Sequence, residues 1–404
     1  MTPGNRDEDG AMANPDGGKD KQWRVAVLPG DGIGPEVMAV TVEALRALAE
    51  QGGPDLVLDE LPWPSHRWHR DNGRIMPEDW HAVLSGYDAI LLGALGDPGP
   101  SSDPGRYLLP DAVSLAPLLD IRKGFDQWAC ERPAMLLEGA PRYLADERAR
   151  DLDMLVIREN SEGEYVGQGG RLAPGSPREV ATQMEVFTRA GAERIFRHAF
   201  ERAAARAGER RAGQRRDRQF PLPDGGTAHA QVCLVTKRNA LRYWGEMYTE
   251  VFAAVAEEFP DVATHHELVD AACMKFVMSP WQFDVVVASN LQGDILTDLA
   301  AVLSGGMGVA PSCNLNPSDR RQPPMFEPTH GSAPDIAGQN LAGPQAMLLT
   351  AAMMLDWMGE EDARAARAAS RLRTAVESDL RVHGTAQRAT TVIGEAVVKA
   401  LEAV

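Results

Sequence analysis

The chain is short of positive charge relative to its acidic residues. Lysine and arginine together total 41 against 58 aspartate and glutamate residues in a chain of 404, which gives a formal net charge of −17. Nucleic acids and anionic membranes are recognised by clustered positive charge, so this balance argues against both kinds of partner. An anionic small molecule would have to be bound by local arginines, against the overall field.

Cysteine motifs and long apolar runs are also missing. The cysteines form no C-x-x-C pair, which argues against a zinc site and against a disulfide framework; they are Cys130, Cys233, Cys273 and Cys313. Residues 1–22 are polar, lack the apolar segment of a secretory signal, and predict a disordered tail. The longest apolar stretch, residues 346–358, contains an aspartate and is too short to span a bilayer. We therefore expect a soluble, cytoplasmic protein.

Short apolar strands alternate with amphipathic helices along the rest of the chain. This alternation predicts an α/β fold with a largely parallel sheet. The predicted strands are residues 24–29, 55–60, 88–94, 153–159, 231–237 and 283–290. The predicted helices are residues 35–51, 189–207, 242–258 and 344–357.

One segment, residues 202–218, carries seven arginines against Glu209 and Asp217. It can be a contact site for an acidic partner, or a solvated helix end that runs into a surface loop. No aromatic residues interleave with the arginines, and this favours the solvated helix end.

The first strand is followed by LPGDGIGPE, which invites comparison with a dinucleotide-binding loop. That fingerprint requires G-x-G-x-x-G, and although Gly30 and Gly32 fit, the third glycine position is occupied by Pro35. Proline is well suited to the first turn of a helix. The fingerprint therefore fails, and no phosphate loop of the G-x-x-x-x-G-K-S/T type is present.

A second glycine-rich loop, FEPTHGSAPDIAGQNLAGP, spans residues 326–344. Its residues Gly331, Ser332 and Ala333 are small enough for a ligand to approach the backbone closely. Asp335 can accept a hydrogen bond from a ribose 2′-hydroxyl and would repel a 2′-phosphate. Such loops are also common in turns.

Asp294 and Asp298 are four residues apart in SNLQGDILTDLAA, so in a helix their carboxylates lie on one face. Asp270 follows another apolar run and is a candidate third oxygen ligand. Three carboxylates without cysteine or histidine suit Mg²⁺ or Mn²⁺. Aspartates are also favoured near helix N-termini without any metal, and the spacing alone leaves both interpretations open.

Arg122, Arg132 and Arg158 occur in I-R-K, E-R-P and I-R-E, and each can bind a carboxylate through its planar guanidinium. Taken singly, each also fits a structural salt bridge. Tyr165 and Lys237 are a candidate proton donor and general base, because a lysine near a metal and arginines has a lowered pKa. As isolated residues they also fit a partly buried tyrosine and an exposed lysine.

Taken in chain order, these motifs resemble the metal-dependent β-decarboxylating dehydrogenases, which include isocitrate, isopropylmalate, homoisocitrate, tartrate and D-malate dehydrogenases. The resemblance covers residues 23–404. The segments RIMPEDW, FDQW and IRENSEGEYVGQGGR are most similar to the tartrate/D-malate branch. Isopropylmalate dehydrogenases usually carry a different stretch in place of ENSEGEY.

The resemblance implies an isopropylmalate dehydrogenase-like fold of two α/β domains with a mixed, largely parallel sheet that is not a Rossmann fold. A large domain on the cofactor side would comprise residues 23–127 and 305–404. A small domain, residues 128–304, would provide dimerisation and the substrate and metal side. The family also implies a homo-oligomer, at least a dimer, in which Lys237 and Asp270 reach into the partner's active site.

The resemblance also implies roles for individual residues. Lys237 would take the proton of the substrate hydroxyl while hydride passes to NAD, and Tyr165 would protonate the enol left after CO₂ departs. The substrate would be contacted by Arg122, Arg132, Arg158 and Leu118, and Leu118 disfavours an extra carboxylate such as that of isocitrate. The metal ligands would be Asp270, Asp294 and Asp298. The NAD-binding residues would be Glu327, His330, Gly331, Ser332, Ala333 and Asp335.

These roles predict NAD-dependent oxidative decarboxylation of a small 2-hydroxy diacid such as D-malate or tartrate, with Mg²⁺ or Mn²⁺ and with K⁺ as a further candidate. Alternatives are an isopropylmalate-type or specialised-pathway enzyme with an altered pocket, and a non-catalytic regulatory paralogue. The chain departs from the family at Gly343, Gln292 and Glu131, and its insertion at residues 205–228 is long. Glu131 is expected to place negative charge beside the substrate arginines.

Overall fold

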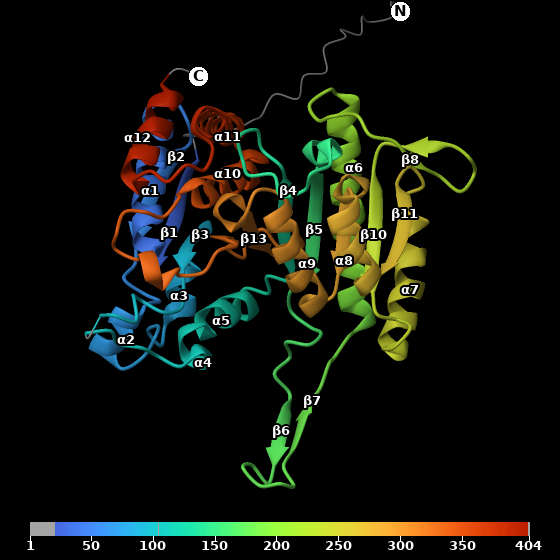
Figure 1. The fold of residues 1–404 in the computed structure, drawn as a ribbon, viewed down its shortest axis with the longest axis horizontal. Coiled ribbons are helices and arrows are strands. Elements are labelled where there is room, and N and C mark those ends of the chain that lie inside the picture. The colour runs from blue at the N-terminus through green and yellow to red at the C-terminus, as the bar shows by residue number, and fades with distance from the viewer. Residues whose placement is uncertain (1–20, 104, 403–404) are drawn as a thin grey trace, which may run out of the picture.

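The structure is a computed structural model, and it describes residues 21–103 and 105–402. Most of the predicted N-terminal tail, residues 1–20, lies outside the described residues. The first strand begins at Gln22, so the tail prediction, which extended to residue 22, ends too late. From there the chain builds one long sheet covered by helices on both faces (Figure 1).

Ten strands of the described residues form this sheet, in the order β11-β10-β12-β5-β4-β13-β14-β3-β1-β2. Neighbouring strands are parallel except at β4–β5, β4–β13 and β13–β14, which are antiparallel. The strands are β1 (Gln22–Gly30), β2 (Asp55–Glu60), β3 (Ala89–Ala94), β4 (Ala129–Met135), β5 (Asp153–Glu159), β10 (Gln231–Thr236), β11 (Ala263–Leu268), β12 (Val285–Ala288), β13 (Pro311–Leu315) and β14 (Met325–Pro328). The predicted α/β class with a mixed, largely parallel sheet is confirmed.

The helices are α1 (Gly34–Glu50), α2 (His66–Asn72), α3 (Trp80–Leu84), α4 (Asp111–Ser114), α5 (Ala116–Gly124), α6 (Arg189–Arg211), α7 (Arg242–Ala256), α8 (Val269–Met278), α9 (Asn290–Leu303), α10 (Gln345–Gly359), α11 (Ala363–His383) and α12 (Thr390–Leu401). Short 3₁₀ helices lie at Glu147–Asp151, Pro280–Gln282, Met307–Val309 and Pro334–Ile336. Among the described residues, no helix combines the length and apolarity that crossing a membrane requires.

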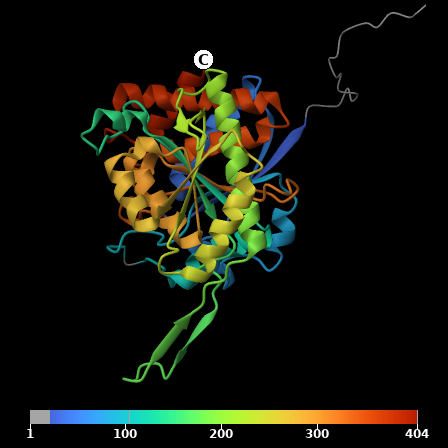
Figure 2. The same ribbon diagram turned by 90° about the vertical axis from the view of Figure 1, so that its right-hand side faces the viewer.

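The central stretches of β1, β3, β5, β10 and β12 are apolar because both faces of the sheet are covered there. Val25 and Val27 of β1 pack into a cluster with α1, α10, α11 and α12, whereas Ala26 and Leu28 belong to a cluster on the opposite face. In the other half of the sheet, α6 and α7 cover one face, and α8 and α9 cover the other (Figures 1 and 2). The predicted division of the chain into two domains, with boundaries at 127/128 and 304/305, stays a prediction.

Two hairpins lie outside the large sheet. The strands β6 (Gly169–Leu172) and β7 (Val180–Gln183) form an exposed arm that projects from the body of the molecule (Figures 1 and 2). The strands β8 (Phe220–Pro221) and β9 (Thr227–Ala228) form a short hairpin within the predicted insertion.

The arginine-rich segment is not the solvated helix end that the sequence favoured. The side chains of Arg206 and Arg210 are 6% and 0% exposed, and both donate hydrogen bonds of 2.7 Å to the carboxylate of Asp284, which is itself fully buried. Arg215 pairs with Asp153 at 2.6 Å. The prediction is wrong here because these arginines neutralise Asp284, which is buried directly before β12, and Asp153, the first residue of β5. That requirement of the fold is not visible in local composition.

Candidate active site

Two of the predicted substrate arginines stand on neighbouring antiparallel strands at the centre of the sheet. Cys130 of β4 lies opposite Arg158 of β5 in the strand register. Because side chains alternate between the faces of a strand, Arg132 projects from the same face as Cys130 and therefore from the same face as Arg158. Helix α9 packs on this face (Figure 1).

Arg158 is held by the first turns of α9. Its Nε and Nη2 atoms donate to Oδ1 of Asn290 at 2.9 and 2.7 Å, and its Nη1 atom donates to Asp294. A Cβ atom at Gly293 would lie 2.8 Å from Cβ of Arg158. The glycine of NLQGD therefore permits the close approach of helix and arginine.

Asp294 and Asp298 both face Arg132, as their four-residue spacing predicted. One carboxylate oxygen of each lies 3.6 Å from Nη1 of Arg132, and the same nitrogen donates to Oγ1 of Thr297 at 2.7 Å. The predicted helix and the shared face of the two carboxylates are confirmed, while their role as metal ligands stays a prediction.

The electrostatics of this cluster favour further ions of both signs. Burial lowers the pKa of Arg158, and the neighbouring charge of Arg122 lowers it further. Burial acts on Arg132 in the same direction, but the negative charge of Cys130, followed by those of the surrounding carboxylates, outweighs this, so its pKa is raised. Burial raises the pKa of Asp298, and the charge of Asp294 adds to that rise. A carboxylate beside Arg158 and a cation beside Asp298 would each relieve an unfavourable charge.

Arg122, the third predicted substrate arginine, lies in the last turn of α5. Its Nη2 atom donates to Oε1 of Glu327 at 2.6 Å, and the same oxygen accepts a hydrogen bond of 2.8 Å from Nδ2 of Asn314. Glu327 was predicted to bind NAD, and the structure places it against a predicted substrate residue. One turn before Arg122, Leu118 packs at the edge of the core beside α5.

Tyr165 follows β5 in a loop and reaches the same helix as Arg158. Its hydroxyl donates to Oδ2 of Asp294 at 3.1 Å, and Cζ of Arg158 lies 5.1 Å from the centre of its ring. Burial and the charge of Asp294 raise the pKa of the phenol, so it stays protonated at neutral pH. Tyr165 is thus a hydrogen-bond donor at the metal-ligand candidates.

Lys237 and Asp270 form a separate pair. Lys237 follows β10, Asp270 lies in the first turn of α8, and Nζ of the lysine donates to the carboxylate at 2.8 Å. Within residues 21–103 and 105–402, no hydrogen bond or ion pair joins this pair to Asp294, Asp298 or Tyr165. In one chain, Lys237 and Asp270 therefore lie apart from the predicted site residues that contact α9.

The predicted cofactor loop rests on the LPGDGIGPE segment. The carbonyl oxygen of Ser332 accepts a hydrogen bond of 2.9 Å from the backbone N–H of Ile33. Gly32 has a positive φ of +60°, and a Cβ atom there would lie only 2.0 Å from that carbonyl oxygen. The glycines of the first loop thus allow close contact with the chain's own backbone.

The cofactor loop is also fixed from α1. Glu36, in the first turn of that helix, accepts hydrogen bonds from the backbone N–H groups of Gly338 and Asn340. Asp335 is exposed. Nε2 of His330 is buried without a hydrogen-bond partner in the described structure, and burial lowers the pKa of this imidazole. A buried ring nitrogen without a partner fits a polar group of a nucleotide bound to this loop.

The oxygen ligands for a metal are only partly assembled. Asp294 and Asp298 offer the hard oxygen donors that Mg²⁺ and Mn²⁺ prefer. The described part of this chain nevertheless contains no group of three histidine, cysteine, aspartate or glutamate side chains that could hold a metal. Asp270 is paired with Lys237 and is not grouped with the other two aspartates.

Glu131 does not lie beside the substrate arginines, contrary to expectation. It projects from the opposite face of β4 to Arg132, where it accepts hydrogen bonds from Nε2 of His198 at 2.7 Å and pairs with Nε of Arg202 at 3.1 Å. Burial alone would raise the pKa of this carboxyl, but the charge of Arg202 and the bond from His198 lower it to about 2. The negative charge of Glu131 is therefore neutralised by residues of α6.

Sequence reasoning missed several residues of the site. Asn290 fixes Arg158, Asn314 fixes Glu327, and Glu164 lies at the N-terminus of α9. Asn290 directly follows a strand and opens a helix that carries two aspartates, which is a usable signal. Nothing in local sequence marks the other two, because their partners are distant in the chain.

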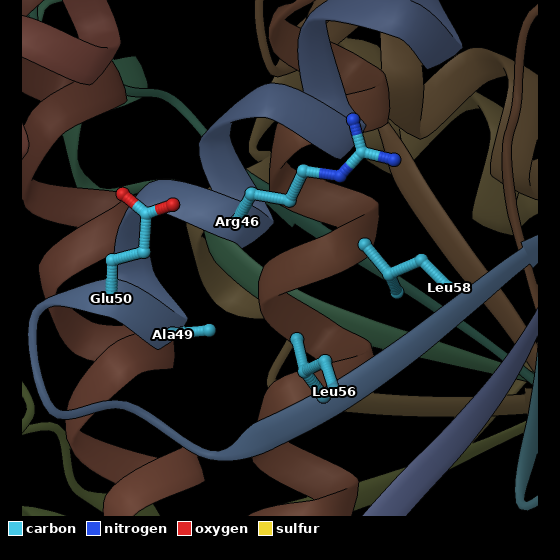
Figure 3. A pocket seen from close by; sticks show the side chains of 5 residues that line it. All are labelled: Arg46, Ala49, Glu50, Leu56 and Leu58. Atoms are coloured by element: carbon cyan, nitrogen blue, oxygen red, sulfur yellow. The ribbon is translucent and has the colours of Figure 1, made fainter.

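A cavity of about 260 Å³ lies away from these residues. It is lined by Arg46, Ala49 and Glu50 of α1 and by Leu56 and Leu58 of β2 (Figure 3). Because β2 is the last strand of the sheet, this cavity is at the far edge from the arginines and the aspartates. It takes no part in the candidate site.

The chain matches a known protein family and resembles solved structures. The family model "isocitrate/isopropylmalate dehydrogenase" matches residues 24–213 and 225–400. The chain is similar to the crystal structure of isocitrate dehydrogenase from Methylococcus capsulatus, with a TM-score of 0.72 and 28% identity over 94% of this chain and 99% of the other.

Curated relatives are similar over most of their length. D-malate dehydrogenase [decarboxylating] of Escherichia coli (strain K12) is 41% identical over 90% of this chain and 92% of the relative. A probable tartrate dehydrogenase/decarboxylase of Agrobacterium vitis is 42% identical over 88% and 90%. The 3-isopropylmalate dehydrogenase of Thermobifida fusca (strain YX) is 42% identical over 93% and 97%. Whole-chain identity therefore does not separate these substrates.

Proposed function

Because the chain belongs to the isocitrate/isopropylmalate dehydrogenase family, we propose that it carries out NAD-dependent oxidative decarboxylation of a small 2-hydroxy dicarboxylic acid, D-malate or tartrate, with Mg²⁺ or Mn²⁺. Family membership makes the protein an oxidoreductase of the decarboxylating dehydrogenase type. One observation carries the proposal for the site. Arg132, Arg158 and Tyr165 converge on the carboxylates of α9, so anion binding, cation binding and proton donation meet at one place.

The arginines are proposed to bind the two carboxylates of the substrate. Arg132 and Arg158 are almost entirely buried, and a guanidinium offers paired donors that match a carboxylate. Arg122 would complete the set once the substrate competes for its contact with Glu327. Three arginines allow a doubly charged anion to bind inside an acidic protein.

The residues of the chain fit both NAD and a divalent cation. His330 and the backbone of Ser332 would hold NAD, and exposed Asp335 would accept from its ribose 2′-hydroxyl and repel a 2′-phosphate. Asp294 and Asp298 would hold Mg²⁺ or Mn²⁺, and K⁺ remains a further candidate cofactor. When bound, NAD accepts a hydride and the divalent cation acts as a Lewis acid on the substrate oxygen.

Lys237 and Tyr165 are proposed to move the protons. As the C2–H bond breaks, Nζ of Lys237 takes the hydroxyl proton and C2 becomes a ketone. The resulting β-keto acid loses CO₂ by cleavage of the bond between C3 and its carboxylate, and the electron pair of that bond remains as the enolate form of the enol, which the next proton transfer converts to the ketone product. The hydroxyl of Tyr165 then donates its proton to C3.

A complete site is proposed to require a second copy of the chain. Lys237 and Asp270 do not meet Asp294 in one chain, yet the proposed chemistry needs all of them. The helices on either side carry exposed apolar residues: Met274 and Met278 of α8 are 63% and 68% exposed, and Ile295 of α9 is 53% exposed. A second copy covering this surface would bury them and deliver its Lys237 and Asp270 to the first site.

An isopropylmalate-type substrate is the second candidate, and one observation favours it. Leu115 and Leu119 are 39% and 37% exposed, and with Leu118 they lie within two turns before Arg122. Leucines presented in this way would suit a branched apolar substituent on C3 better than the hydroxyl of tartrate.

A substrate panel separates these proposals. The protein is assayed for NADH formation with D-malate, tartrate, 3-isopropylmalate and isocitrate, with NAD or NADP and with Mn²⁺ or a chelator. We expect the highest kcat/KM for D-malate with NAD and Mn²⁺. Preference for 3-isopropylmalate would support the second candidate, and no reduction with any acid would support a non-catalytic regulatory paralogue.

A further inference from the structure

The loop between β5 and Tyr165 is tied to two helices by glutamate side chains. Glu162 accepts hydrogen bonds from the backbone N–H and the hydroxyl of Thr188, the residue that caps α6, at 2.9 and 2.6 Å. Glu164 accepts from the hydroxyl of Ser289 at 2.8 Å and from the backbone N–H of Leu291 at 3.0 Å. The loop is therefore attached to the N-terminus of each helix by a different carboxylate.

The contact of Glu164 supplies what α9 lacks. The first N–H groups of a helix have no partner within the helix, and Ser289, the residue before α9, does not cap it with its own side chain. Glu164 accepts from one of these N–H groups, and it places a negative charge at the positive end of the helix dipole. The cap is thus provided from 125 residues away in the sequence.

Glu164 and Tyr165 are adjacent in the chain and contact the same helix one turn apart. Glu164 is fixed at Leu291, and Tyr165 donates to Asp294, three residues further along. The hydroxyl of Tyr165 has one hydrogen bond to α9, at 3.1 Å, so its position depends on where the loop is anchored. We propose that Glu164 is a positioning residue that holds the Tyr165 hydroxyl against α9.

The functional part of this inference rests on the proposed role of Tyr165 as proton donor. The positional part does not, because it concerns only where the phenol lies. Glu162 provides a matched control. Glu162→Ala removes the same charge from the same loop, but the carboxylate that is lost binds Thr188 at α6, which carries none of the candidate site residues. The backbone carbonyl of Glu162, which accepts a hydrogen bond of 3.0 Å from Nδ2 of Asn290, is kept in this variant.

Fluorine NMR tests the position without any activity. The chain contains six tyrosines, so labelling with 3-fluorotyrosine gives a small set of signals, and the signal lost in Tyr165→Phe assigns Tyr165. We expect Glu164→Ala to shift and broaden this signal and Glu162→Ala to leave it in place. An unmoved signal in folded Glu164→Ala, judged by far-UV circular dichroism, would overturn the proposal.

A double-mutant cycle tests the consequence for turnover. We expect Glu164→Ala to lower kcat about tenfold with KM changed less than about threefold, and Glu164→Gln, which keeps one acceptor oxygen, to recover part of the loss. In the Tyr165→Phe background, Glu164→Ala should change kcat less than about twofold, because the group it positions is gone. A full tenfold loss in that background would overturn the proposal.

The two readouts separate this inference from the proposed function. A wild-type protein that reduces NAD with none of the acids overturns the proposed function, while the fluorine spectra still decide where Glu164 holds Tyr165. If the wild type is active but the Tyr165 signal is unchanged in Glu164→Ala, only the positioning role of Glu164 is overturned.

Discussion

Nζ of Lys237 lies 2.8 Å from Oδ1 of Asp270, and this ion pair stands apart from the carboxylates of α9 in the described chain. The pair is partly exposed, with 30% of the lysine side chain and 64% of the aspartate side chain accessible. Exposure of this kind suits residues that act on a second chain.

Mixing experiments test whether sites are shared. Lys237→Met and Tyr165→Phe should each be severely impaired alone while still binding NAD. After mixing and re-association, hybrid dimers contain one intact site of two, so equal mixing should restore about a quarter of the wild-type site number. Activity is measured before and after re-association.

A second mixture is the control for sharing. Lys237→Met and Asp270→Asn both damage the pair contributed by one chain, so every site of their hybrid is defective and no recovery is expected. Absence of recovery in the first mixture, or equal recovery in both, would contradict sites shared in the proposed way.

Gly32→Ala tests whether the close contact between Gly32 and Ser332 positions the cofactor loop. Its positive φ costs an alanine about 1–2 kcal/mol, and the new Cβ would also collide with the carbonyl oxygen of Ser332. Gly52 has a φ of +84° with nothing within 4 Å of a Cβ atom, so Gly52→Ala carries the backbone strain alone. We expect NAD affinity, measured by calorimetry, to fall about tenfold or more only in Gly32→Ala. Equal NAD affinities in the two variants would mean that the contact between Gly32 and Ser332 does not position the cofactor loop.

The buried carboxyl of Glu131 predicts a stability change in acid. Its pKa is lowered from 4.5 to about 2, so its stabilising contribution is present above pH 4.5 and is lost as the pH falls toward 2. The loss is about 3 kcal/mol by linkage, as an order of magnitude. Urea unfolding is measured across this range in the wild type and in Glu131→Gln. The difference between their free energies of unfolding should shrink toward pH 2. A difference that stays constant with pH would argue that the ionisation of Glu131 does not stabilise the fold.

The burial of Arg210 predicts that its replacement strongly lowers the free energy of unfolding. Removing one partner of a buried ion pair costs about 3–5 kcal/mol, so Arg210→Ala should strongly lower the free energy of unfolding. The adjacent Arg211 is exposed, and Arg211→Ala should change it by about 0.5 kcal/mol or less. Urea unfolding of both variants checks this. Similar values would mean that the segment is solvated after all.

The sequence predicted elements whose cause is local. The apolar runs of β1, β3 and β5 were found because buried parallel strands are continuously apolar, and the shared face of Asp294 and Asp298 follows from helix geometry. Strand β4 (Ala129–Met135) was missed because it carries Glu131 and Arg132, whose charges are neutralised by helices on opposite faces.

What local sequence could not predict depends on distant partners. Buried Arg206 and exposed Arg216 look alike in the chain, and only the position of Asp284 separates the buried one. Glu164 looks like one more acidic loop residue until α9 is placed beside it. The contact of Glu327 with Arg122 and the separation of Asp270 from the other aspartates likewise depend on residues distant in the chain.

We propose that this protein oxidises and decarboxylates its substrate at the site around Arg158, Asp294 and Tyr165. The most direct test measures NADH and released CO₂ together, with D-malate, NAD and Mn²⁺. We expect one CO₂ for each NADH, with both products lost in Lys237→Met. NADH formed without CO₂ would contradict it.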